Sequence, residues 1–166
     1  MAVPATYAAH IVIVGPGPQL HIAIGSLGTT IDTVVFDLTA TTPGNGIPVA
    51  GSATVLVEVA YKKQAAGAVT VVVTTDGSSA MTCTTPATCG ATSIPMTEIS
   101  WTASQGQWPS GTFSGAANQA LLNFPAGGGG GAITRREDVL SYSYANSTVY
   151  PTGVYQGRVT YTAVSF

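Results

Sequence analysis

A strict two-residue alternation of apolar side chains is the feature of this sequence that most constrains its fold. Every odd position from 3 to 13 is apolar, and similar alternation returns in residues 55–61, 69–73 and 154–166. Successive side chains of a β-strand point to opposite faces, so this period is typical of strands that bury one face. No segment has the 3.6-residue period of an amphipathic helix. The sequence therefore predicts an all-β protein.

Turn-forming residues separate the predicted strands at short intervals, as in residues 41–48 and at Asp76-Gly77. With 166 residues, the chain has the length of one domain. Many short strands in one domain favour an antiparallel β-sandwich of the immunoglobulin-like type, with a jelly-roll as the alternative. We expect an N-terminal strand in residues 1–14, a Gly-Pro hinge in 15–18 and a β-sandwich domain in 19–166.

Three local patterns carry more specific expectations. The alternating segments 55–61 and 69–73 predict a hairpin joined through residues 62–67. Apolar residues alternate again over 34–38 and predict another strand. A run of five glycines at 127–131 predicts an exposed, flexible loop, because glycine has no side chain to pack.

Charged side chains are scarce in this protein. They make up 7% of the chain, with five basic residues and a net charge of -2. This is too little positive charge for a nucleic-acid or anionic-lipid surface, and no apolar run approaches the ~18 residues of a membrane span. Low charge also removes a common guard against pairing of sheet edges. The composition therefore fits a protein that assembles with copies of itself.

The two cysteines, Cys83 and Cys89, lie close together in a loop rich in threonine and proline. A disulfide that closes this loop is the favoured interpretation and predicts a secreted or cell-surface protein. The alternatives are two reduced thiols or half of a metal site, although His10 and His21 lie far away in sequence. Because residues 1–14 lack the features of a signal peptide, a secreted protein is expected here in mature form.

Motifs of known catalytic chemistry are missing from the sequence. It has no GxSxG elbow, HExxH pair or cluster of carboxylates, so we expect neither an enzyme nor a bound metal or cofactor. The charge cluster Arg135–Asp138 has two interpretations, a solvated polar patch or an intersubunit salt-bridge site. Asn146 begins an Asn-Ser-Thr glycosylation sequon, which is a motif of low specificity.

Four aromatic residues raise the possibility of a sugar-binding surface. Flat rings stack on the apolar faces of sugars, and strand alternation puts two of the four on one side of a single strand. Packing in the core or in an interface is the favoured alternative. The four residues are Trp101, Trp108, Tyr142 and Tyr144.

The two ends of the chain carry the strongest functional signal. The N-terminal segment has a continuous apolar face and a Gly-Pro hinge behind it, so it is a candidate donor strand for a neighbouring subunit. The alternative is that it pairs within its own domain. At the other end, a Gly-x-Tyr corner at Gly153 opens a late strand whose apolar face is a candidate groove for such a donor. The donor face comprises Val3, Ala5, Tyr7, Ala9, Ile11 and Ile13, and the groove face comprises Tyr155, Val159, Tyr161 and Ala163.

This combination resembles bacterial chaperone–usher-type pilins and related secreted fimbrial sandwiches, through Gly153, Tyr155, Val159 and Tyr161 and the segment Val3 to Ile13. Many such pilins bridge cysteines between early strands, whereas Cys83 and Cys89 lie in mid-chain. The resemblance implies a structural subunit of an extracellular filament, a homopolymer built by strand donation with the help of an assembly chaperone. The alternatives are a secreted carbohydrate-binding module and a viral or phage surface jelly-roll.

Overall fold

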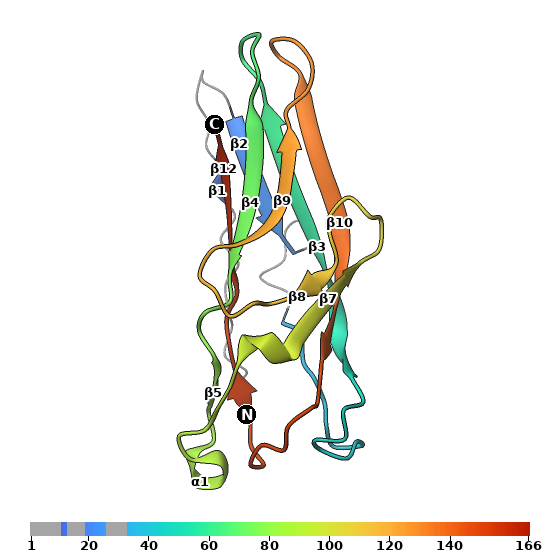
Figure 1. The fold of residues 1–166 in the computed structure, drawn as a ribbon, viewed down its shortest axis with the longest axis vertical. Helices are drawn as coiled ribbons and strands as arrows, with labels where there is room; N and C mark the ends of the chain where they lie inside the picture. Colours follow the sequence, from blue (N-terminus) through green and yellow to red (C-terminus); the bar gives the residue numbers. More distant parts are fainter. Residues whose placement is uncertain (1–10, 13–18, 26–32) are drawn as a thin grey trace.

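The fold consists of antiparallel β-sheets arranged along one long axis (Figure 1). In this computed structural model, residues 11–12, 19–25 and 33–166 are described. The largest sheet has the order β1 (Ile11–Val12), β2 (Gln19–Ile24), β3 (Val49–Lys62), β10 (Ile133–Tyr144), β7 (Ile99–Ala103) and β8 (Gly111–Thr112). The second has the order β12 (Thr160–Ser165), β4 (Thr70–Asp76) and β9 (Gln119–Pro125), and the third β11 (Tyr155–Gln156), β5 (Met81–Cys83) and β6 (Ser93–Ile94). Within these ranges the helices are short, α1 (Pro86–Cys89) and the 3-10 turn η1 (Met96–Glu98).

One apolar core lies between the six-stranded sheet and the sheet β12–β4–β9. Val57 and Val59 of β3 are fully buried, as are Val71 and Val73 of β4, and all four belong to the same cluster of core side chains. Alternate residues of both strands point into this core, as a two-residue period requires. The predicted all-β antiparallel sandwich is confirmed.

The predicted hairpin between residues 55–61 and 69–73 is wrong. β3 pairs with β2 and β10, whereas β4 pairs with β9 and β12, so the two strands belong to different sheets. Both have a strongly apolar face, and they bury these faces against each other across the core instead of side by side. The segment 63–69 is therefore a crossover between sheets.

The predicted strand over residues 34–38 keeps its alternation but forms no regular strand. Val35 is held by two hydrogen bonds, donating its N–H to Ser52 Oγ (3.0 Å) and accepting one from Ser52 N–H (2.9 Å). Val34 and Phe36 pack against the core. Gly51 leaves room for them, because a Cβ built there would lie 2.3 Å from Val34 Cγ1.

The late strand predicted over residues 154–166 is interrupted. β11 pairs with β5, and β12 pairs with β4 in a different sheet, so the chain changes sheets between Gln156 and Thr160. A Cβ built on Gly157 would lie 2.5 Å from both Met81 Cγ and Met96 Cε. Glycine therefore lets the chain pass these methionines as it crosses from one sheet to the next.

The glycine run is exposed, as predicted, but it is also held in place. Gly131 N–H donates to Lys63 O (2.6 Å), and the buried Lys63 Nζ donates to Gly128 O (3.1 Å). A Cβ on Gly130 would lie 2.7 Å from Gln64 O, so only glycine permits this close approach of the two loops. Contacts to its backbone, rather than packing of its side chains, hold this loop in position.

Candidate assembly surface

β12 forms one edge of the second sheet. It pairs with β4 over six successive residue pairs without a register shift, and no strand pairs with its other side among the described residues. Residues 160–165 contain no charged residue and no proline. A regular, uncharged edge presents a row of backbone donors and acceptors to another chain. β12 therefore has the regularity of an edge that can accept a further strand, although β2 of the largest sheet lies beside it.

β9 forms the opposite edge of the same sheet and is likewise without charged residues, but it differs from β12 in regularity and in proline. Its pairing with β4 has a register shift at Val73/Thr74, and it ends at Pro125. The guanidinium of Arg136 lies over the ring of Phe124, 5.4 Å from its centroid. Bulges, proline and nearby cations are features that discourage strand addition. Of the two edges, only β12 lacks them.

β12 is attached to the opposite sheet by a hydrogen bond between two tyrosine hydroxyls. Tyr161 of β12 and Tyr142 of β10 lie 2.6 Å apart, oxygen to oxygen. Burial raises the pKa of Tyr142 to about 12, although the hydrogen bond from Tyr161 lowers it, and burial likewise raises the pKa of Tyr161 well above its ordinary value. Both hydroxyls therefore stay protonated at neutral pH, and the bond fixes how β12 lies over the core.

The residues of the predicted late-strand groove are divided between two sheets. Tyr155 belongs to β11, Val159 lies just before β12, and Tyr161 and Ala163 are on β12. All four are partly buried and pack against the core. The structure thus brings Tyr161 and Ala163 together on the inner side of β12, whereas Tyr155 lies at a different sheet.

Most of the predicted donor strand lies outside the described residues. This holds for Val3, Ala5, Tyr7, Ala9 and Ile13. The backbone of Ile11 and Val12 is described and forms β1, which pairs with β2 of the same chain. Strand donation by residues 1–14 stays a prediction.

The predicted aromatic sugar-binding surface is not formed by the residues that suggested it. Trp101, Trp108, Tyr142 and Tyr144 are between 3% and 9% exposed, so their ring faces are buried in the core. Phe113 packs between two of them, with its ring centroid 4.8 Å from that of Trp101 and 6.4 Å from that of Tyr142. The alternative of core packing describes these four residues.

Cys83 and Cys89 form the predicted disulfide. The loop that it closes is attached to the corner before β11, where Thr84 N–H donates to Val154 O (2.7 Å) and Val154 N–H donates to Thr85 Oγ1 (3.0 Å). A Cβ on Gly153 would lie 2.2 Å from Cys89 Sγ, so the Gly-x-Tyr corner needs glycine for this contact. The disulfide fits an oxidising environment.

The charge cluster Arg135–Asp138 is part of β10. Its residues lie in two different environments, an exposed group of ion pairs around Arg135 and a buried carboxylate at Asp138. Arg135 forms ion pairs with Glu58 on the neighbouring β3, at 2.8 Å, and with Glu137. Its partners therefore lie within the same chain, on the outer face of the largest sheet.

Asp138 has a different role, because its carboxylate is fully buried. It accepts hydrogen bonds from the backbone N–H groups of Gln105 (2.8 Å), Gln107 (2.8 Å), Trp108 (3.1 Å) and Val139 (2.8 Å). Burial by itself would raise the pKa of Asp138, but these four bonds outweigh it and lower the pKa to about 2. The ionised carboxylate therefore holds the loop between β7 and β8.

Asn146, the first residue of the sequon, is also buried, with φ of 50°. Its Nδ2 donates to Thr42 O (3.1 Å) and to Asn45 Oδ1 (2.9 Å), and its Oδ1 accepts from Gly44 N–H (2.8 Å). A glycan cannot be attached to this nitrogen without breaking those bonds. The asparagine is required by the fold, and it holds the loop before β3 against the end of β10.

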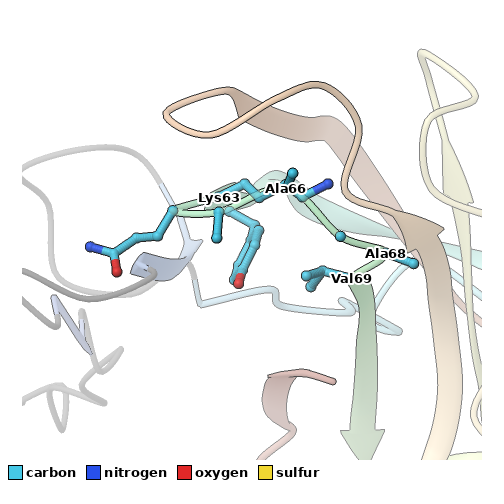
Figure 2. A pocket seen from close by; sticks show the side chains of 8 residues that line it. Lys63, Ala66, Ala68 and Val69 are labelled. Carbon is cyan, nitrogen blue, oxygen red and sulfur yellow. The ribbon is translucent and has the colours of Figure 1, made fainter.

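A hollow of about 320 Å³ opens beneath the crossover loop 63–69 and is lined mainly by small apolar side chains, among them Ala66, Ala68 and Val69 (Figure 2). Within the described residues, no group of three or more His, Cys, Asp or Glu side chains could hold a metal ion. In the same part of the chain, no helix is long and apolar enough to cross a membrane.

The chain matches no family model, and comparisons with curated proteins and with solved structures found no match. The resemblance to pilins therefore remains a prediction from the sequence.

Proposed function

We propose that this protein is a structural subunit of an extracellular filament in which a strand of one copy pairs with the edge of the next. The observation that carries the proposal is β12, a regular edge strand without charge, proline or register shift. Such an edge is rare in a protein that functions as a monomer, because it invites pairing with other chains. Strand addition at β12 would continue the sheet β9–β4–β12 into a neighbouring copy.

The donor in this proposal is the N-terminal strand, residues 1–14. Its odd-numbered side chains are apolar, which suits the strip beside β12 where Tyr161 and Ala163 are partly buried. Ladder hydrogen bonds would supply affinity, and the alternating side chains would set the register. An isolated subunit would expose this edge, so assembly would require a chaperone or prompt polymerisation. The disulfide supports a secreted, cell-surface location.

Deleting residues 1–14 tests the proposal. The full chain is expected to form fibres in negative stain, and the deletion is expected to abolish them. A synthetic peptide of residues 1–14 should then bind the shortened protein, and the same peptide with Ile11→Asp should not, because the charge would enter an apolar strip. Fibres that form equally well without residues 1–14 would contradict strand donation by this segment.

A further inference from the structure

The long axis of the fold ends in loops on both sides (Figure 1), and five of the large exposed apolar side chains lie in or beside these loops, whereas Val35 and Val164 do not. The five most exposed large ones are between 59% and 76% exposed, namely Ile47, Val149, Val154, Ile133 and Phe166. We call the end formed by loops 39–48, 84–92 and 145–154 the lower end, and the end formed by loops 63–69 and 126–132 the upper end. Large exposed apolar side chains that cluster are typical of contact surfaces.

Contacts place three of these side chains at the lower end. Val149 lies against Gly44, since a Cβ on that glycine would be 2.4 Å from Val149 Cγ2. Ile47 belongs to the same loop as Gly44, and Val154 is hydrogen-bonded to the disulfide loop through Thr84. The three loops of this end contain no charged residue. Burial of this surface would therefore require little desolvation of charge.

The other two lie at the upper end. Ile133 pairs with Lys62 at the end of β3, and the backbone of Phe166 exchanges two hydrogen bonds with Thr70 at the start of β4. The hollow of about 320 Å³ beneath loop 63–69 opens at this end (Figure 2). The upper end thus offers a recess lined by small apolar side chains, and the lower end offers projecting apolar side chains.

Unpaired charges at the two ends have opposite signs. Lys62 at the upper end is exposed and has no acidic partner among the described residues. Asp37 and Glu98 border the lower end, where Asp37 accepts a hydrogen bond from Thr39 N–H and Glu98 accepts one from Ser147 Oγ. Neither carboxylate has a basic partner within the described ranges. Two equivalent ends would repel or ignore each other, whereas a lower end and an upper end attract.

We infer that the lower end of one copy docks on the upper end of a second copy, with Val149 and Val154 against the hollow and Lys62 near Asp37. This is a head-to-tail contact, which repeats in the same sense from copy to copy and so builds a row instead of a closed dimer. This inference rests on the proposed function, because it assumes that the copies form a filament. The contact itself is a second one between subunits and is distinct from the strand pairing at β12.

The test uses the full chain with Ala163→Lys, in which a lysine on the inner side of β12 blocks strand addition and leaves both ends intact. Sedimentation velocity over a range of concentrations at low salt is expected to show reversible association. Adding Lys62→Glu should weaken that association about two- to fivefold, and adding Asp37→Lys to this variant should restore it. Arg158→Glu, the same charge change outside the two ends, is the matched control and should leave association unchanged.

A second pair of variants tests the apolar part of the contact. Val149→Thr with Val154→Thr keeps the side-chain shape and should weaken association by about fourfold for each methyl group removed. Val164→Thr, at an exposed valine of β12, should have no effect. A strictly monomeric Ala163→Lys protein, or association that ignores these substitutions, would overturn the head-to-tail contact. Fibres that persist in Ala163→Lys would instead count against strand addition at β12, so the two failures are distinguishable.

Discussion

The two edges of the sheet β12–β4–β9 share a central strand and differ in almost everything that governs strand addition. Neither strand contains a charged residue, but β9 has a register shift and a terminal proline, with Arg136 against its Phe124, whereas β12 is regular and free of proline. A low charge content affects both edges equally, so composition alone does not explain the difference. The register shift and the proline are present on β9 and missing from β12, so the two edges of this sheet differ in their suitability for strand addition. Of these two edges, β12 is the one without a register shift or a proline.

The largest expected effect separates the two edges directly. Ala163→Lys puts a charge on the inner side of β12 and should abolish fibres, because inward-pointing charges oppose strand addition. Leu122→Lys places the same side chain on β9, at the partly buried residue that pairs with Val73 on the side opposite Ala163, and should leave fibres unchanged. Both variants would be compared with the unmodified chain by light scattering and negative stain. Equal loss of assembly in the two variants would remove the distinction between the edges.

Acid should lower the stability of the fold through Asp138, which lies away from β12 and holds the loop between β7 and β8. The pKa of Asp138 is about 2 in the folded protein and ordinarily 3.8. Its stabilising contribution is therefore present above pH 4 and is lost as the pH falls from about 4 towards 2. Asp138→Asn should lower the free energy of unfolding by roughly 3 kcal/mol at neutral pH, since it weakens several charge-assisted hydrogen bonds.

Urea unfolding at a series of pH values measures both effects. The control is Asp37→Asn, an exposed carboxyl group that accepts a hydrogen bond from the N–H of Thr39 in its own loop. If the free energy of unfolding falls equally with acid in the unmodified protein and in Asp138→Asn, another group is responsible for the acid dependence.

Space around two glycines provides a steric comparison. Gly157 stands before β12, where a Cβ would lie 2.5 Å from Met81 Cγ, and Gly127 follows β9 in open space. Gly157→Ala should lower stability by roughly 2 kcal/mol, as added volume in a filled site does. Gly127→Ala should be nearly neutral. Thermal unfolding of both variants checks this, and equal melting temperatures would show that the crossing before β12 adjusts without strain.

The smallest expected effect comes from the tyrosine pair behind β12. In the folded protein the pKa of Tyr142 is about 12 and that of Tyr161 is also raised, so the unfolded chain ionises first as the pH rises. Stability should therefore be complete below pH 10 and fall between about 10 and 12. Tyr161→Phe should lower the free energy of unfolding by roughly 1 kcal/mol at neutral pH. It should also reduce the loss of stability at alkaline pH. Tyr150→Phe, outside the pair, is the control; an equal change there would exclude a specific role for the pair.

The sequence predicted which side chains are buried better than it predicted which strands pair. The alternation of β3 and β4 identified Val57, Val59, Val71 and Val73 as core residues, because a two-residue period directly reports one buried face. The same pattern cannot distinguish neighbours within a sheet from strands that face each other across the core. The hairpin prediction failed for this reason.

The candidate sites were predicted to different degrees. The disulfide followed from the spacing of Cys83 and Cys89, and the low charge pointed to assembly. The choice of β12 over β9 could not be made from sequence, because it depends on a register shift and on a ring–cation contact between distant residues. Burial of Asn146 was equally invisible, since its partners lie about 100 positions away.

Hydrogen exchange on assembling protein tests the central claim most directly, because strand addition protects the backbone amides of the edge that accepts the strand. Peptides covering residues 160–165 and 119–125 would be followed by mass spectrometry in the Ala163→Lys variant and in the assembled unmodified chain. The predicted result is new protection in residues 160–165 on assembly, with residues 119–125 unchanged. Assembly that leaves residues 160–165 unprotected, or that protects residues 119–125 instead, would contradict β12 as the acceptor edge.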